Sequence, residues 1–250
     1  METWLAILLP FALVLARTAA FVAVLPIFGW RALSTTVRIG IALLLTIFFG
    51  FITPAAVIAE KIQWLSAILL LTQEIIWGLG LGLAARFAFL AVQQGGRMAG
   101  MQMGFADAGI FDPGQGERSR PVSLFIEMTF ILFFLVAGGH QVLIMIIARS
   151  YDVLPLGQAV DVAGLLEALV RTGSTMLIFG LKLAAPILAA FILMAVVLAV
   201  LSKVLPEMNI LMISFPIRIG MGLLMAAAII PLFDSFASEL LKRMNRFLIA

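Results

Sequence analysis

The chain has 250 residues, of which 64% are hydrophobic and only 12% are charged, and its formal net charge is +3. With a mean hydropathy of +1.19, it cannot cover its own surface with polar side chains, so the composition excludes an ordinary water-soluble domain and predicts a membrane protein. The lack of cysteine excludes disulfides and thiolate-bound metals, and the single His140 cannot form a histidine-rich metal centre. The basic residues are scattered among apolar stretches, as in membrane proteins, which argues against binding to nucleic acid.

Six apolar segments follow one another and predict an all-α, polytopic membrane protein. Two of them, residues 39–59 and 128–148, contain no charged residue and have about the 20 residues that cross ~30 Å of hydrocarbon. The other four include isolated charges: residues 3–30, 62–85, 172–202 and 208–233. The chain begins Met1-Glu2, without the basic region of a signal peptide, so we expect the first segment to be retained. We expect one membrane domain, residues 1–250.

The number of basic residues in the loops does not predict an orientation. Alternate loops and termini carry six Lys and Arg residues on each side, so the positive-inside rule gives a tie. Either some segments do not span fully, or partner chains impose the orientation.

Prolines lie inside or at the edges of the apolar segments, at positions 10, 26, 186, 216 and 231. Each removes a backbone donor and tends to kink or end a helix. We therefore expect partly broken helices, buried in a bundle or an assembly where the freed carbonyls find partners. The alternative is a set of mild kinks without consequence.

Glycines spaced four residues apart predict close helix packing. Gly78 and Gly82 form one G-x-x-x-G pair, and Gly96, Gly100 and Gly104 continue the same spacing. A nucleotide-binding loop is disfavoured, because no G-K-[ST] motif and no strand pattern accompany these glycines.

Five charges fall within or beside the apolar segments, where an isolated charge costs at least ~2.5 kcal/mol at the bilayer centre. They are Arg17, Glu74, Glu127, Lys182 and Arg218. Two acids and three bases favour structural or interfacial pairing. A proton or ion relay is the alternative, but such relays usually contain a chain of acidic residues and histidines.

A polar insert, residues 95–121, is rich in glycine and methionine. We expect its first part to be helical as far as about Phe105, and the Asp-Pro and glycine-rich remainder to form an ordered loop. Met98, Met101 and Met103 can repack around objects of varied shape. The alternative is an ordinary solvent-exposed loop.

His140 follows the Gly138-Gly139 pair, where we expect a membrane boundary or a helix break. A structural hydrogen bond is the favoured role, because the chain contains neither G-x-S-x-G nor H-E-x-x-H. The sequence therefore predicts a protein that is not an enzyme.

Several motifs occur in a consistent order along most of the chain. They are Arg17 with Leu25-Pro26-Ile27-Phe28-Gly29 and Arg38; Glu74 with Gly78 and Gly82; Gly100 to Phe105 with Asp112-Pro113; Gly139-His140 with Ser150 and Leu154-Pro155; and Leu205-Pro206-Glu207-Met208-Asn209-Ile210. Together they resemble the FliR family, export-gate subunits of type III protein secretion related to SctT of virulence systems. Glu207 departs from the family, which often has Gln there.

The resemblance implies a subunit of the flagellar basal body in the bacterial inner membrane. A FliR-like chain would join FliP- and FliQ-like chains in a helical, pore-forming assembly of helical hairpins, surrounded by lipid. It would work with FlhA- and FlhB-like components and conduct unfolded flagellar subunits, without a cofactor.

The same resemblance implies that the central loop, about residues 104–120, plugs the pore, with the three methionines of the insert near it. The candidate plug residues are Gly104, Phe105, Asp107, Gly109, Ile110, Phe111, Asp112, Pro113 and Gly114. Phe105 and Phe111 are the candidate occluding side chains.

Three alternatives remain. The same subunit could serve a virulence injectisome. A small-molecule secondary transporter would usually show paired halves with related helix breaks, and no internal repeat is evident. An intramembrane enzyme would need a nucleophile and a base within reach.

Overall fold

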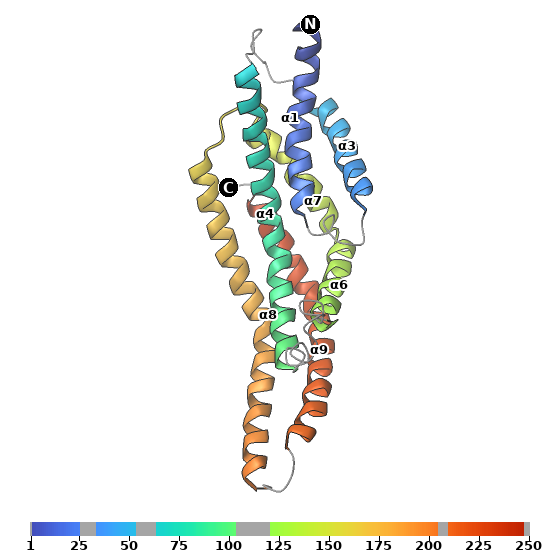
Figure 1. Cartoon of the computed structure of the whole chain (residues 1–250), viewed down its shortest axis with the longest axis vertical. Coiled ribbons are helices and arrows are strands. Elements are labelled where there is room, and N and C mark those ends of the chain that lie inside the picture. The colour runs from blue at the N-terminus through green and yellow to red at the C-terminus, as the bar shows by residue number, and fades with distance from the viewer. Residues whose placement is uncertain (1, 26–33, 54–63, 104–120, 205–209, 248–250) are drawn as a thin grey trace. The chain divides into compact units, whose positions relative to one another are not determined.

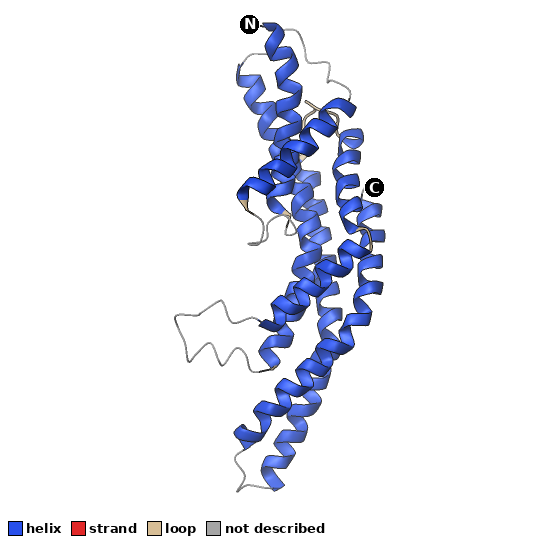
Figure 2. Ribbon diagram, turned by 90° about the vertical axis from the view of Figure 1, so that its right-hand side faces the viewer, coloured by secondary structure: helices blue, strands red, loops and turns tan. Residues whose placement is uncertain are grey.

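A computed structural model describes residues 2–25, 34–53, 64–103, 121–204 and 210–247. These residues contain seven helices and no strand, which confirms the all-α fold (Figures 1 and 2). The helices are α1 (Glu2–Val24), α3 (Thr35–Ile52), α4 (Trp64–Gln102), α6 (Pro121–Val136), α7 (Gly139–Val153), α8 (Val162–Val204) and α9 (Ile210–Phe247).

Prolines do not end the described helices. Pro10 lies inside α1, Pro186 inside α8, and both Pro216 and Pro231 inside α9. The expectation of helix breaks at these four prolines is therefore wrong, because one missing backbone donor leaves the rest of the helical ladder intact. Pro26 lies outside the described residues.

A break occurs at Ala137 and Gly138, inside the segment 128–148 that the sequence predicted to be one span. It confirms the helix break that was expected at the glycine pair before His140. Gly138 has a φ of 81°, in the left-handed region that glycine adopts without strain, and it is the N-cap of α7. The charge-free segment is therefore two helices, α6 and α7.

Three of the described helices are long and apolar enough to cross a membrane by themselves: α3, α4 and α8. A fourth span results if α6 and α7 together form one broken span. Shorter apolar stretches lie in α1 and α9, at Leu8–Val24 and Met212–Ala228. The helices thus confirm a polytopic membrane protein, with fewer self-sufficient spans than apolar segments.

The chain divides into two compact units, and α4, α8 and α9 each run through both. The first unit comprises residues 1–87, 138–174 and 241–250. Here α1 packs along α3, and a buried hydrogen bond of 2.8 Å joins the hydroxyls of Thr18 and Thr46. Leu13, Val14 and Ile147 are among its fully buried side chains.

The second unit comprises residues 88–137 and 175–240. Three buried aromatic rings form part of its core, since Phe89 of α4 lies 5.7 Å from Phe130 and 5.0 Å from Phe134 of α6 between ring centroids. Elsewhere in this unit, Gly180 of α8 approaches the backbone of Ala91 in α4, where an added Cβ would lie 2.7 Å from the carbonyl oxygen.

Candidate functional site: a buried charge network

A buried ion pair joins α1 to α4 in the first unit. Nε of Arg17 donates to Oε2 of Glu74 at 2.6 Å, and the two side chains are 0% and 3% exposed. The sequence predicted that the embedded charges would pair, and these two do. Their separation of 57 positions makes the pair a tertiary contact that fixes one helix against another.

Arg17 also closes the C-terminal end of α7. Its Nη1 donates to the carbonyl oxygens of Ser150 and Leu154, both at 3.0 Å, and to the Ser150 hydroxyl at 3.3 Å. The last carbonyls of a helix have no partner within the helix and carry partial negative charge. The guanidinium therefore supplies a donor to the Leu154 carbonyl and a second donor to the Ser150 carbonyl, which also accepts the backbone N–H of Leu154.

Glu74 binds the turn that follows. Its Oε1 accepts a hydrogen bond of 3.2 Å from the backbone N–H of Gly157, which has a φ of 81°. Both carboxylate oxygens are thus used, one by α1 and one by the connection between α7 and α8. Any side chain at Gly157 would strain this backbone conformation.

The aromatic ring of Tyr151 packs against the guanidinium of Arg17. The centre of the Arg17 guanidinium lies 4.5 Å from the centroid of the Tyr151 ring, a cation–π geometry, and the same ring packs 5.6 Å from the ring of Phe49 in α3. Tyr151 belongs to α7, so the network joins α1, α4 and α7, and through Phe49 it reaches a fourth helix, α3.

These contacts describe a structural joint. A buried ion pair is tolerated when further hydrogen bonds offset the cost of burying its charges. Here Nε and Nη1 of Arg17 and both carboxylate oxygens of Glu74 have partners, whereas Nη2 of Arg17 has none among the described residues. Among the described residues, no other carboxylate and no histidine bonds to the pair. The contacts therefore show no continuation of the kind that a proton relay would use.

Glycines permit the close approach of α1 and α4 beside the ion pair. A Cβ at Gly78 would collide with the carbonyl oxygen of Arg17, and one at Gly82 would lie 3.0 Å from that of Phe21. Gly78 is one turn after Glu74, so the crossing and the ion pair share one site. Gly96 is buried, whereas a Cβ at Gly100 would meet nothing within 4 Å.

The other three embedded charges have different surroundings. Glu127 accepts a hydrogen bond of 3.1 Å from Gln93. Lys182 is exposed, with Nζ 5.7 Å from the Phe179 ring centroid. Arg218 is half-buried, and its Nε has no hydrogen-bond partner among the described residues.

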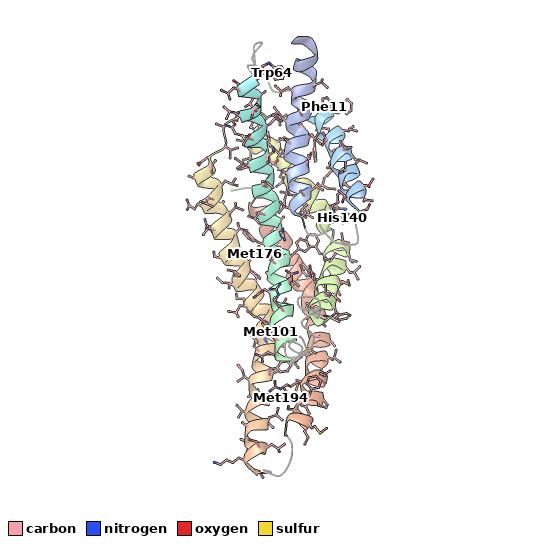
Figure 3. All side chains as sticks on the ribbon, in the orientation of Figure 1. Phe11, Trp64, Met101, His140, Met176 and Met194 are labelled. Atoms are coloured by element: carbon pink, nitrogen blue, oxygen red, sulfur yellow. The ribbon has the colours of Figure 1, made fainter. Side chains whose placement is uncertain are left out.

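The described part of the insert is helical up to Gln102. Met98 is half-buried, and Met101, near the end of α4, is exposed (Figure 3). Met103 is completely buried and occupies the space in front of Gly222 in α9. All nine candidate plug residues, from Gly104 to Gly114, lie outside the described residues.

The sequence did not predict the roles of Tyr151 and Gly157. Tyr151 is the only tyrosine of the chain, and Pro155 with Gly157 is a turn signal directly after a helix. These two sequence features do not by themselves show that Tyr151 and Gly157 contact Arg17 and Glu74.

His140 has an exposed side chain in the first turn of α7.

Nearly the whole chain is similar to known bacterial export proteins. Residues 8–244 match the family described as bacterial export proteins, family 1. The chain is 33% identical to the flagellar biosynthetic protein FliR of Pectobacterium carotovorum, covering 90% of this chain and 85% of that protein. It is 29% identical to FliR of Escherichia coli strain K12, covering 96% and 91%, and 30% identical to FliR of Bacillus subtilis strain 168, covering 86% and 83%. Together with the apolar helices, these matches show that the chain belongs to the FliR family of bacterial export proteins.

Proposed function

We propose that this chain is a pore-forming core subunit of the flagellar type III export gate. It conducts unfolded flagellar subunits across the bacterial inner membrane and has no enzymatic role. Its relatives carry a flagellar name, which supports flagellar export over a virulence injectisome. In this proposal FliP- and FliQ-like chains complete the pore, and FlhA- and FlhB-like components work with it.

The length of the helices supports an assembly of several chains. With 43 residues, α8 has an axis about 64 Å long, twice the ~30 Å of hydrocarbon in a bilayer. Only a tilt of about 60° would place all of it in the hydrocarbon, whereas membrane helices tilt by ~0–40°. Part of α8 must therefore lie outside the hydrocarbon.

The exposed surface of α8 is apolar along almost its whole length, so the part outside the hydrocarbon is apolar too. Twelve Leu, Ile and Val side chains along α8 are 55–68% exposed: Val162, Leu166, Val170, Leu177, Ile178, Leu181, Ile192, Leu193, Val196, Val197, Val200 and Val204. Where lipid does not cover such a surface, another apolar protein surface must cover it. This observation carries the proposal, because partner chains with similar helices could cover α8 and enclose a conduit.

We further propose that residues 104–120 form the plug of this pore, as the family resemblance implies. One end of this segment follows Met103, which is buried at Gly222, and the other end precedes α6 at Pro121. The described residues on both sides of the segment thus belong to the second unit. In this proposal Phe105 and Phe111 supply the bulk that closes the lumen.

Deleting residues 104–118 is expected to increase ion leakage through the assembled complex, because the closed lumen would lose its occluding side chains. Conductance of the purified complex in planar bilayers measures this directly. Replacing Phe105 and Phe111 together with alanine should also leak, whereas a matched pair, Glu117→Ala with Arg118→Ala, should not. Unchanged conductance after the deletion would refute the plug but not the pore.

Co-purification tests the assembly itself. A tagged form of this chain should bring down FliP- and FliQ-like chains from membranes in fixed proportions. Recovery of the chain as a stable monomer that binds a small molecule would refute the export proposal in favour of a transporter.

A further inference from the structure

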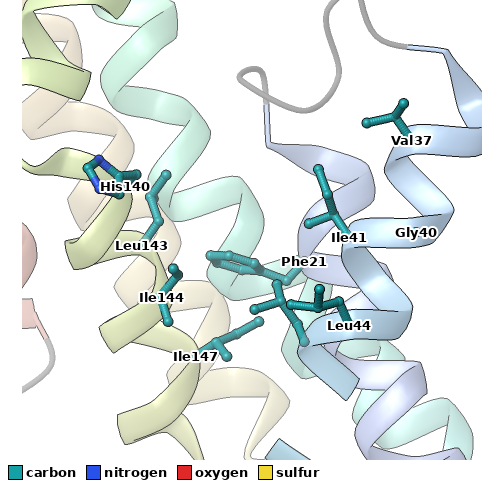
Figure 4. Close-up of a pocket in the computed structure, with 10 residues that line it drawn as sticks. Phe21, Val37, Gly40, Ile41, Leu44, His140, Leu143, Ile144 and Ile147 are labelled. Atoms are coloured by element: carbon teal, nitrogen blue, oxygen red, sulfur yellow. The ribbon is translucent and has the colours of Figure 1, made fainter. Parts of the chain in front are cut away.

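The exposed apolar face of α8 is bounded by charges, unlike the apolar groove of the first unit. That groove, of about 400 Å³, lies between α3 and α7 (Figure 4), and no Asp, Glu, Lys or Arg lines it. In α8, by contrast, Lys182 and Lys203 enclose a run of 20 residues, 183–202, that contains no charged residue. Both lysine side chains are exposed. The two charges therefore define the ends of this segment.

The distance between the two lysines matches the thickness of lipid hydrocarbon. The helix axis from Lys182 to Lys203 is about 32 Å long, at roughly 1.5 Å per residue. The hydrocarbon core of a bilayer is ~30 Å thick. Lysine side chains near the ends of a membrane helix extend towards the lipid headgroups, so a lysine at each end is typical of a helix segment that crosses a bilayer.

Both lysines lie on the exposed face of this segment. At about 100° of rotation per residue, Lys182 and Lys203 are separated by roughly 60° around the helix axis. Between them, the Leu, Ile and Val side chains on the same side are 57–68% exposed: Ile192, Leu193, Val196, Val197 and Val200. The side chains on the opposite side are 1–8% exposed: Leu183, Ala184, Ile187, Phe191, Met194 and Leu198. One apolar stripe thus runs from one lysine to the other.

The first half of α8 differs in composition. Residues 162–181 form a stretch of equal length, but they include Glu167 and Arg171, whose side chains are exposed. They also include three residues with hydroxyl groups: Thr172, Ser174 and Thr175. Charged side chains in hydrocarbon are costly, so this half fits a bilayer less well than residues 183–202. Since α8 is too long to lie wholly in the hydrocarbon, the half outside is the first one.

We propose that lipid covers residues 183–202 of α8, with acyl chains on the stripe between the lysines and headgroup phosphates at Lys182 and Lys203. Residues 162–181 then lie outside the hydrocarbon, where accompanying chains cover their exposed apolar side chains. Lys182 thereby lies at the membrane boundary, rather than inside the apolar segment 172–202 that the sequence predicted. The inference rests on the proposed function only for the presence of accompanying chains.

Single cysteines test the position of the bilayer, because the chain contains no cysteine of its own. Leu193 lies midway between the lysines, and Leu177 in the first half has the same exposure, 68%, so Leu177→Cys is the matched control for Leu193→Cys. Each variant carries a bimane label and is purified with its accompanying chains, their own cysteines replaced, in nanodiscs of phosphatidylcholine with brominated acyl chains. The bromine should quench the label at position 193 severalfold more strongly than the label at position 177.

Equal quenching at the two positions, or stronger quenching at position 177, would overturn the proposal. Weak quenching at both would show that protein covers the whole helix, and would overturn it as well. Recovery of FliP- and FliQ-like chains with each variant is measured first. Loss of those chains from the unlabelled wild type would contradict the proposed function, whereas a wrong quenching pattern in an intact complex contradicts only the position of the bilayer.

The two boundaries are tested separately with a quencher at the level of the headgroups. Bimane on Lys182→Cys or on Lys203→Cys should be quenched severalfold more strongly than bimane on Leu193→Cys by phosphatidylcholine that carries a nitroxide on its headgroup. Headgroup quenching that is strongest at position 193, or that is absent from position 182 or position 203, would overturn the proposed boundaries.

Discussion

Replacing Arg17 with methionine should remove most of the chain from the membrane fraction and abolish export. The substitution leaves the 3%-exposed carboxylate of Glu74 without its cation and the carbonyl of Leu154 without the Arg17 donor. Removing one partner of a buried ion pair destabilises by about 3–5 kcal/mol, a large part of the stability of most domains. Immunoblots of membranes and motility in soft agar measure the two effects.

The double substitution Arg17→Met with Glu74→Met distinguishes a structural joint from a functional charge. Apolar side chains of similar volume often replace a buried ion pair without loss, so the double variant should accumulate better than either single variant. Lys203→Met, a change at an exposed cation near the end of α8, should stay within about 0.5 kcal/mol of the wild type.

Two results would contradict the structural interpretation. If Arg17→Met accumulates and exports like the wild type, the network does not hold the first unit together. If the double variant accumulates normally but does not export, the charges themselves act in transport, as a relay would require.

The sequence predicted the helical membrane fold and the family because both depend on features spread over the whole chain. Apolar segments of helical length, and motifs in a fixed order, do not depend on any single contact. The embedded charges were a harder case. The sequence showed two acids and three bases, but not that α1 and α4 cross at Gly78, which brings Arg17 beside Glu74 rather than Glu127.

Helix ends were predicted least well. Proline chemistry suggested breaks at Pro10, Pro186, Pro216 and Pro231, yet the helices continue through all four. The break at Gly138 lies in a charge-free stretch that is long enough to be one span, so length and charge did not separate α6 from α7. Only the glycine pair before His140 marked the position, and glycines at Gly78 and Gly82 serve helix packing instead. Glycine thus ends a helix at one position and permits close helix packing at others, and only the tertiary contacts distinguish the two roles.

Gly78→Ala should destabilise the chain, whereas Gly220→Ala should not, although both substitutions add one methyl group to a helical glycine. At Gly78 the new Cβ collides with the backbone carbonyl of Arg17, so α1 and α4 must separate. Overpacking of this kind typically costs about 1–3 kcal/mol, and here it also stretches the adjacent Arg17–Glu74 bond. At Gly220 nothing lies within 4 Å, and alanine is the better helix former by up to ~1 kcal/mol.

Gly180→Ala repeats the test in the second unit, where the new Cβ would lie 2.7 Å from the Ala91 carbonyl oxygen. Thermal unfolding of each variant in detergent, followed by circular dichroism, should rank Gly220→Ala at or above the wild type and the other two below it. Of these three glycines, only Gly78 borders the ion pair. The destabilising effects of Gly78→Ala and Arg17→Met should therefore not be additive in a double variant, because the loss of the guanidinium costs less once the helix crossing has opened. Full additivity of those two changes would mean that the glycine crossing and the charge network stabilise the first unit independently.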